Sequence, residues 1–402
     1  MTGFIHIIKK KILIAVLCAA VCLPAASGLC ADASAAGTKK ARLPDYVEVT
    51  AGAKKKVAVK GTKKTVTWKV IKGKKYIRLS KKKNQSVVIT GKKKGMAVLA
   101  AKAGKKTVTC RVYVRAKCAW RLEELRDKRF VNFRTSDDAL IQGRIPAAGI
   151  DLSGMDTLHI SGSAQPSLLS LPVMYQTLKE HAPSGARIYL IDLRQETHAY
   201  VNGYGISRYA VTANDANAGL SAGEVRKKEA AELAALAGKK RRLRVFGSSD
   251  QAVMSDVAVT AKQIITEREA AQAVGFSCRR FTCTDKVWPN EEAIDQFVAF
   301  CRTLPENAWL HFHCKAGQGR TTTFMVMYDM MNNPDVAFSD IIARQYAQGG
   351  IDLTYVPETG TVFNINRHKL RAKNIRLFYR YVQEQAPKDY EQTWSVWYQK
   401  NA

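Results

Sequence analysis

At residues 313–321 the chain reads HCKAGQGRT, with a cysteine at 314 and an arginine at 320 on either side of a glycine-containing stretch. Residues 308–313 before it are apolar and aromatic-rich, as in a buried strand, and residues 321–331 after it contain neither Gly nor Pro. The pattern predicts a strand that passes through a tight loop into a helix. In such a loop the backbone N–H groups converge on one anion at the positive end of the helix.

Each polar residue of this stretch has a chemical use if the anion is a phosphate. The Cys314 thiol attacks phosphorus only as a thiolate, which the helix dipole, the loop amides and Arg320 would stabilise. The planar guanidinium of Arg320 matches two phosphate oxygens at once and would hold the transferred group. We expect Thr321 to donate a hydroxyl hydrogen bond to the sulfur and His313 to brace the loop. The other loop residues are expected to contact the substrate phosphate: Lys315, Ala316, Gly317, Gln318 and Gly319.

Phosphoryl transfer through a cysteine also needs a general acid, which protonates the leaving oxygen and later activates water. The candidate is Asp285, in the stretch FTCTDKVWPN at residues 281–290. It follows a strand-like run and precedes Trp288 and Pro289, which would stiffen a movable loop. From the local sequence alone, Asp285 is equally suited to capping a turn.

The stretches TDKVWP and HCKAGQGRTT together resemble the protein tyrosine phosphatase-like inositol polyphosphatases, the cysteine phytases of anaerobic bacteria. The likeness extends from about Phe130 to the C-terminus, through VNFRTSDDAL, LHISGS, IDLRQETH, LPENAWLHFHC and FYRYVQE. The resemblance implies a phosphatase-like α/β catalytic domain over residues 118–402, with a central sheet covered by helices. It also implies that phosphates are removed from phytate and lower inositol polyphosphates through a phosphocysteine intermediate, with neither a metal nor a cofactor.

The resemblance further implies roles for individual residues. Cys314 would be the nucleophile, Asp285 the general acid and Arg320 the phosphate clamp. Four other basic side chains are expected to contact substrate: Arg134 in NFRTS, His198 in RQETH, Lys286 beside the acid, and Arg367. The chain also departs from expected patterns. Ordinary tyrosine phosphatases place the acid directly after Trp-Pro, where this chain has Asn290, and residues 355–366 are nearly uncharged where the resemblance implies lysines.

The N-terminus has the order of a secretory signal peptide. Lysines at 9–11 precede an apolar run from Ile12 to about Ala26, and small residues follow. The signal is expected to span residues 1–31, with cleavage between 28 and 36. This predicts export to the periplasm, the cell surface or the medium of a bacterium. An uncleaved membrane anchor is the alternative.

Residues 44–115 alternate short apolar runs with turns rich in Lys and Gly. The runs are VEVT, KVAVKG, TVTWKV, YIRLS, SVVITG, AVLAAKAG and TVTCRVYV, and seven strands at this spacing predict a small β-sandwich. The pattern resembles a bacterial immunoglobulin-like domain of the group 2 kind. Cys110 lies inside this module, and the sequence leaves open whether it pairs with Cys118.

The positive charge of the chain is concentrated in this module. Residues 38–117 hold 26 Lys and Arg and 2 Asp and Glu, a net +24 of the total +30. Such a field attracts polyanions, among them phosphorylated substrates and anionic cell-envelope polymers. The module has no base-reading motif and few aromatic residues, which disfavours specific binding of nucleic acid. Lysines that merely fill turns and solubilise edge strands are the alternative.

The catalytic region reads as an α/β domain. Capping boxes predict helix starts at Ser221 and Thr266. Strands are predicted at 187–193, 277–283 and 309–313, so helices and strands alternate around a sheet covered on both faces. The basic stretch 239–247 is expected to be a solvated edge strand. The sequence has no CxxC pair and no His cluster with metal-ligand spacing, and buried thiols are expected at Cys278, Cys283 and Cys301.

Other functions are compatible with the same residues. A phosphotyrosine or phosphoinositide phosphatase would use identical chemistry and differ in the breadth of its pocket. A non-enzymatic polyanion-binding surface protein is a further alternative, but such a binder has no need of Asp285 beside Cys314 and Arg320.

Overall fold

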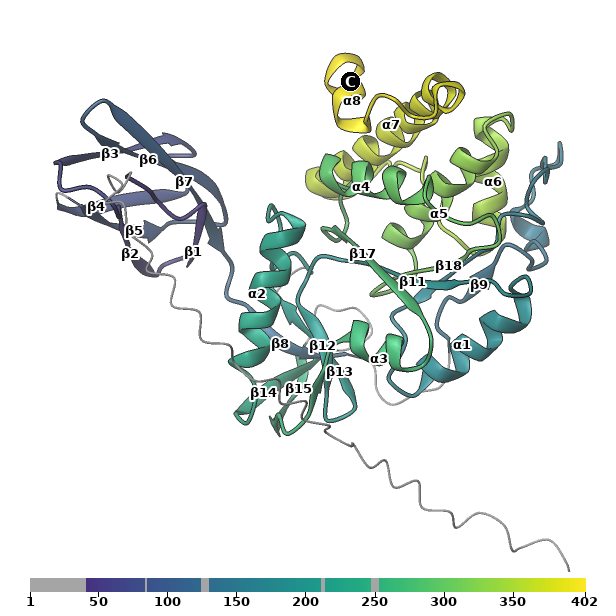
Figure 1. The fold of residues 1–402 in the computed structure, drawn as a ribbon, viewed down its shortest axis with the longest axis horizontal. Helices are drawn as coiled ribbons and strands as arrows, with labels where there is room; N and C mark the ends of the chain where they lie inside the picture. Colours follow the sequence, from purple (N-terminus) through teal and green to yellow (C-terminus); the bar gives the residue numbers. More distant parts are fainter. Residues whose placement is uncertain (1–40, 84, 124–129, 211–213, 247–252) are drawn as a thin grey trace, which may run out of the picture.

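The computed structural model describes residues 41–83, 85–123, 130–210, 214–246 and 253–402 (Figure 1). The expected signal peptide lies outside the described residues. In the described part of the chain, no helix is both long and apolar enough to cross a membrane.

The N-terminal module is a sandwich of two β-sheets, drawn in purple to blue in Figure 1. Its strands are β1 (Tyr46–Thr50), β2 (Lys54–Ala58), β3 (Val66–Lys72), β4 (Ile77–Lys83), β5 (Ser86–Gly91), β6 (Gly95–Ala103) and β7 (Lys106–Arg115). One sheet has the order β1-β7-β6-β3 and the other the order β2-β5-β4. Alternate residues of both sheets, such as Val87, Ile89 and Leu99, share one buried core. The seven strands predicted from the sequence are therefore confirmed.

The six cysteines in the described part of the chain are all free thiols, Cys110 and Cys118 included. Burial raises the pKa of Cys110 to about 11 and that of Cys278 to about 12. Because the thiolate is the reactive form, thiols that are held neutral in this way are poor nucleophiles.

A five-stranded sheet forms the centre of the catalytic region, in the order β17-β11-β18-β10-β9. Its strands are β9 (Arg134–Thr135), β10 (Ile160–Ala164), β11 (Ile188–Arg194), β17 (Ser277–Cys283) and β18 (Trp309–Cys314). β9 is antiparallel to β10, and the other neighbours are parallel. The carboxyl ends of the parallel strands therefore meet at one edge, where ligands bind in open α/β sheets. The predicted strands at 187–193, 277–283 and 309–313 are confirmed within a residue.

Helices cover both faces of this sheet, as predicted (Figure 1). One face carries α4 (Glu291–Cys301), α5 (Gly319–Asn332), α6 (Phe338–Ala347), α7 (Val362–Gln385) and α8 (Trp394–Asn401), and its core includes Phe297, Phe312 and Phe324. The other face carries α1 (Ser170–His181) and α3 (Glu267–Ala273), packed around Leu190 and Trp309. Side chains alternate along β18, so Cys314 belongs to the first core while His313 faces α3.

A second sheet, of six strands, is not predicted by the sequence pattern. It has the order β15-β14-β8-β13-β12-β16. Its strands are β8 (Ala119–Leu122), β12 (His198–Val201), β13 (Tyr204–Tyr209), β14 (Lys240–Phe246), β15 (Val253–Thr260) and β16 (Ile264–Ile265). The expected basic edge strand is β14, which is an inner strand between β8 and β15. The expectation was wrong because the backbone pairing of a strand does not depend on how polar its side chains are.

Both predicted capping boxes are present and fix where two helices begin. Ser221 and Glu224 exchange side chain-to-backbone hydrogen bonds at the start of α2 (Ala222–Ala234), and Thr266 and Glu269 do the same at α3. α2 lies on the side of the molecule that faces the sandwich (Figure 1), and α3 brings Glu267 against the underside of β18.

Candidate active site

The loop between β18 and α5 has the conformation that the sequence predicts. β18 ends at Cys314 and α5 begins at Gly319. Gly317 has a φ of +70°, and a Cβ at this position would overlap the backbone of Ser163 and Ala164 in β10. Only glycine satisfies both conditions without strain.

The loop is held in place by side-chain donors that bind two of its carbonyls. Asn132 Nδ2 donates to the Ala316 carbonyl at 2.8 Å, and Arg134 Nη1 donates to the Gly317 carbonyl at 2.8 Å. These two carbonyls are thus occupied by side chains that lie outside the loop. The N–H groups of residues 316–319, in contrast, donate to no described residue. Free amides at the start of a helix form an anion-binding cradle.

Cys314 lies at the floor of this cradle. Its residue is only 3 % exposed and its thiol is free. The guanidinium groups of Arg134 and Arg320 are both close enough to interact with a negative charge on its sulfur. Two cations are therefore within electrostatic reach of one sulfur.

The guanidinium of Arg320 is fixed by the carboxylate of Glu196. Nη1 lies 2.9 Å from Glu196 Oε2 and Nη2 lies 3.3 Å from Oε1, and Nη1 also donates to the Cys283 carbonyl at 3.1 Å. Arg320 Nε is buried and has no partner among the described residues. A buried donor left without an acceptor is costly, so a phosphate oxygen that accepts from Nε would be stabilised.

Glu196 is a residue of the candidate site that the sequence did not single out. Although burial by itself raises the pKa of this carboxyl, Arg320 and Arg194 together hold the pKa well below its usual range. Arg194 lies between Glu196 at 2.8 Å and Glu123 at 2.8 Å. The available signal was an acidic residue in RQETH, two residues after the buried strand β11 ends at the ligand-binding edge of the sheet.

Asp285 lies beside Arg320, across from the loop. One carboxyl oxygen is 3.3 Å from Arg320 Nη2, and the other accepts from Asn214 Nδ2 at 3.1 Å. Its side chain is 18 % exposed, so part of it is accessible to solvent. The predicted turn is also present, because Lys286 follows with a φ of +64° and an exposed side chain.

Asn290 occupies the position where ordinary tyrosine phosphatases have the acid, and in this structure it caps a helix. It is the N-cap of α4, and its Oδ1 accepts from the Ala293 N–H at 2.8 Å. This geometry leaves Asp285 as the carboxylate beside Arg320 from the predicted acid loop.

Arg134, which is expected to contact substrate, is buried against the loop. It is 2 % exposed, and its guanidinium donates to the Gly317 carbonyl and to Thr322 Oγ1 at 3.1 Å. Burial without a carboxylate partner lowers its pKa to about 10. In this geometry Arg134 supports the loop from below.

His198, which is expected to contact substrate, is buried beside Asp192 and Glu196. Its Nε2 is 3.3 Å from Asp192 and its Nδ1 is 2.9 Å from the Glu196 carbonyl. Burial alone disfavours the charged imidazole, but Asp192 outweighs burial and raises the pKa of His198 to about 10. It lines a cavity of about 580 Å³ beyond the edge strand β17, together with Glu229 and Arg280.

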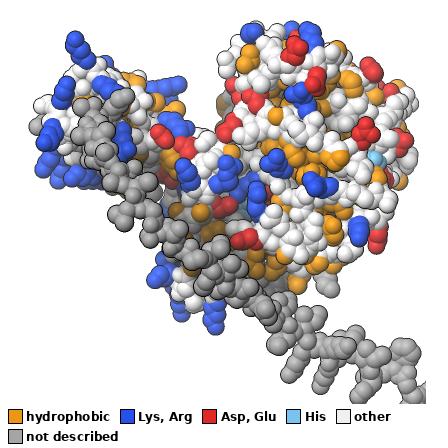
Figure 2. Space-filling view, in the orientation of Figure 1, with side chains coloured by type: hydrophobic (Ala, Val, Ile, Leu, Met, Phe, Trp, Pro, Cys, Tyr) orange, Lys and Arg blue, Asp and Glu red, His pale blue; other side chains and the backbone are white. Residues whose placement is uncertain are grey.

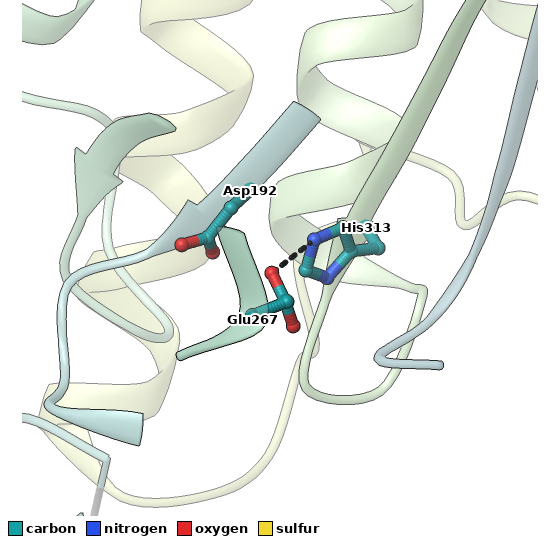
Figure 3. Close-up of side chains that lie close together, drawn as sticks. All are labelled: Asp192, Glu267 and His313. Atoms are coloured by element: carbon teal, nitrogen blue, oxygen red, sulfur yellow. Dashed lines mark ion pairs between the residues drawn. The ribbon is translucent and has the colours of Figure 1, made fainter. Parts of the chain in front are cut away.

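His313, the residue before the nucleophile candidate, points away from the cradle toward Glu267. The distance from Nε2 to Glu267 Oε1 is 2.9 Å, and Figure 3 shows both side chains with Asp192 close by. These three residues offer ligand atoms that lie within 4.8 Å of one another. Arg280, however, is 2.8 Å from Asp192, and His198 supplies a second cation. The cluster is therefore already neutralised, which disfavours a metal ion.

The other predicted site residues are Thr321, Arg367 and four positions of the loop. Thr321 Oγ1 is buried without a hydrogen-bond partner among the described residues, so the expected hydrogen bond to the Cys314 sulfur is absent. Arg367, in the first turns of α7, interacts electrostatically with Asp285 and donates to Asn364 Oδ1 at 2.6 Å. Four loop positions are at least partly exposed at the rim of the cradle: Lys315, Ala316, Gln318 and Gly319.

The loop, the cysteine at the end of a parallel strand and the arginine in the first turn of the next helix define a protein tyrosine phosphatase-like α/β fold. The model of the PTP-like phytase family, described as "Inositol hexakisphosphate", matches residues 191–332. A PTP-like phytase from Bdellovibrio bacteriovorus is 30 % identical, with a TM-score of 0.57, and the match covers 70 % of this chain and 95 % of that protein. The chain belongs to the PTP-like phytase family.

Two further relatives are longer than this chain. The PTP-like myo-inositol phosphatase from Mitsuokella multacida, solved in complex with myo-inositol-(1,3,4,5)-tetrakisphosphate, is 35 % identical with a TM-score of 0.66, over 71 % of this chain and 49 % of that one. Effector protein hopD2 from Pseudomonas syringae pv. tomato is 29 % identical over 276 residues, which are 67 % of this chain and 57 % of the relative. This chain thus spans about half the length of each.

The packing of Gly317 generates a first prediction. Gly317→Ala should lower the free energy of unfolding by roughly 2 kcal/mol or more, because it combines a left-handed φ with a backbone overlap. Gly319→Ala is the matched control, since no atom lies within 4 Å of its added Cβ. Urea denaturation of the two variants measures the difference. Equal stabilities would contradict the packing described for Gly317.

The charge on His198 generates a second prediction, about pH. Its pKa is about 10 in the folded state, against about 6.5 in an unfolded chain. The pair with Asp192 therefore stabilises the fold fully below pH 6.5 and loses that stabilisation as the pH rises toward 10. The difference in free energy of unfolding between wild type and His198→Gln should shrink over this interval. Its slope cannot exceed about 1.4 kcal/mol per pH unit for one proton.

Urea denaturation at a series of pH values measures this difference. His181→Gln, at an exposed histidine at the end of α1, is the matched control. A difference for His198→Gln that stays constant over the interval would contradict the charge assignment.

Proposed function

We propose that this protein is a metal-independent phosphomonoester hydrolase that acts on myo-inositol polyphosphates, phytate first, through a phosphocysteine intermediate. The observation that carries the proposal is the loop between Cys314 and Arg320, where the N–H groups of residues 316–319 and the buried Arg320 Nε have no partner among the described residues. A tetrahedral dianion is the ligand that satisfies all these donors at once.

The reaction we propose has two steps. In the first, the Cys314 thiolate attacks phosphorus, the S–P bond forms and the bond from phosphorus to the ester oxygen breaks. Asp285 gives its proton to that oxygen, so the alcohol leaves neutral. In the second, the Asp285 carboxylate takes a proton from water as the water oxygen attacks phosphorus. The S–P bond breaks, and orthophosphate and the thiolate are released.

The basic residues around the acid favour a substrate with several phosphates. Arg367 on α7 is within electrostatic reach of Asp285, and Lys286 is exposed on the same turn. Phosphates beyond the one being transferred would be attracted to these side chains. The Mitsuokella multacida relative, solved with a myo-inositol tetrakisphosphate, supports the same substrate class.

For the N-terminal module we propose retention of the exported protein on anionic cell-envelope polymers, through a domain of the immunoglobulin-like kind. The support is the distribution of charge. Figure 2 shows Lys and Arg side chains gathered over the outer end of the sandwich, while the catalytic region carries both signs. Exposed lysines occur on several strands and turns, among them Lys54, Lys69 and Lys93.

The nucleophile is tested by substitution. Cys314→Ser should abolish phosphate release from phytate, because an alkoxide forms far less readily than a thiolate, whereas Cys278→Ser should retain wild-type rates. Phosphate release is measured with phytate, a phosphotyrosine peptide and a phosphoinositide, each with and without a chelator. We expect phytate to be the best substrate and the chelator to have no effect. Activity in the Cys314→Ser variant, or loss of wild-type activity with chelator, would overturn the mechanism.

The acid is tested in the same assay. Asp285→Asn should lower kcat on phytate by roughly 10² to 10⁴ while KM changes little, since the leaving oxygen is no longer protonated. Asp335→Asn, at an exposed carboxyl in the turn after α5, is the control. A wild-type kcat for Asp285→Asn would assign the acid role to another residue.

A further inference from the structure

The sandwich packs against residues 215–225 of the catalytic region, which are here called the docking segment. Tyr113 at the end of β7 is 7 % exposed and packs with Leu220 and Val225 in a small apolar cluster of its own. Leu220 is 1 % and Val225 0 % exposed, so this cluster is as well buried as the core of either region.

Polar contacts surround the apolar cluster. Tyr113 Oη donates to the Gly219 carbonyl at 2.6 Å, Arg115 Nη1 donates to the Ala218 carbonyl at 2.7 Å, and Arg111 Nη2 pairs with Glu224 at 2.6 Å. Lys94 pairs with Asp215, and Lys228 of α2 lies 2.8 Å from Glu48 of β1. Because three residues of one strand bind the carbonyls and the carboxylate of this segment, the sandwich holds the docking segment in one conformation.

Gly219 is the point of closest approach. It has a φ of +79°, and a Cβ here would lie 2.8 Å from the Tyr113 ring. A side chain at 219 would therefore push the two parts of the molecule away from each other. Gly223, four residues on, has no atom closer than the tip of Arg226 at 4.0 Å.

The docking segment leads directly to the proposed general acid. Asn214, the residue before the segment, is buried and donates from Nδ2 to Asp285 at 3.1 Å, while its Oδ1 accepts from Arg121 at 3.5 Å. The amide is thus fixed at both ends. The segment is also tied to the acid turn through Gln195, which donates to the Leu220 carbonyl at 3.1 Å and accepts from Thr284 Oγ1.

We propose that Asn214 is a positioning residue for the Asp285 carboxyl, and that the sandwich sets its position by holding the docking segment. The inference rests on the proposed function, because it needs Asp285 to act as the acid. The sandwich then contributes to the chemical step, in addition to the retention on cell-envelope polymers proposed above. An acid displaced by about 1 Å from its line to the leaving oxygen loses much of its effect.

The experiment compares two leaving groups. The alkoxide of an inositol phosphate must be protonated as it leaves, whereas 4-nitrophenolate leaves readily without a proton. In the full chain, Asn214→Ala and Gly219→Ala should lower kcat on phytate about tenfold and kcat on 4-nitrophenyl phosphate less than about twofold. Gly223→Ala should leave both rates at the wild-type value. Tyr113→Phe, which keeps the ring and removes the hydroxyl bound to Gly219, is the milder variant if Gly219→Ala does not fold.

Asp285→Asn separates the two proposals. If it lowers both rates equally, the acid role in the proposed function fails. If it selectively lowers the phytate rate while Asn214→Ala lowers neither rate or both equally, Asn214 is not a positioning residue and the inference is overturned. If Asn214→Ala is selective but Gly219→Ala and Tyr113→Phe are not, the sandwich has no part in positioning the acid. Selective loss in all of them supports the inference.

Discussion

The ion pair between Arg320 and Glu196 is the constraint on which the rest of the site depends. It joins the first turn of α5 to the residues after β11, and it turns the guanidinium so that Nε is left for a ligand. Arg194 and Glu123 extend the pair into a buried row of alternating charges. Removing one member of a buried pair leaves an uncompensated charge that costs about 3–5 kcal/mol. The guanidinium is therefore fixed before any ligand binds, which the proposed role in stabilising a developing charge requires.

Much of the fold followed from local pattern. Alternating runs predicted the seven strands of the sandwich, capping boxes predicted the starts of α2 and α3, and HCKAGQGRT predicted the loop between β18 and α5. These features are local because a strand, a cap or a tight loop is specified by neighbouring residues. The six-stranded sheet was missed because its strands are short or polar, as in KRRLRVF of β14, and are paired by segments distant in the sequence.

The site was predicted less completely, for a physical reason. Arg134 and His198 are basic, as residues that line a phosphate pocket usually are. The sequence cannot distinguish a cation that faces solvent from a buried one, whereas the structure shows Arg134 buried against a loop carbonyl and His198 against a carboxylate. Glu196 and Asn214 show the converse. Asn214 belongs to no quoted motif, and Glu196 stands in RQETH, where only His198 was singled out. Each contacts a central side chain that lies more than 70 residues away in the sequence. Such contacts arise from the meeting of strand ends at one edge of a sheet, which no local window contains.

The contact of Tyr113 with Gly219 also bears on how this molecule was assembled. Domains that fold independently can be exchanged between proteins, because few contacts cross the boundary between them. Here a glycine on one side accommodates an aromatic ring on the other, and a buried apolar cluster seals the boundary. A chimera that contained only the catalytic region, or only the sandwich, would lack the surface that packs against the half it kept.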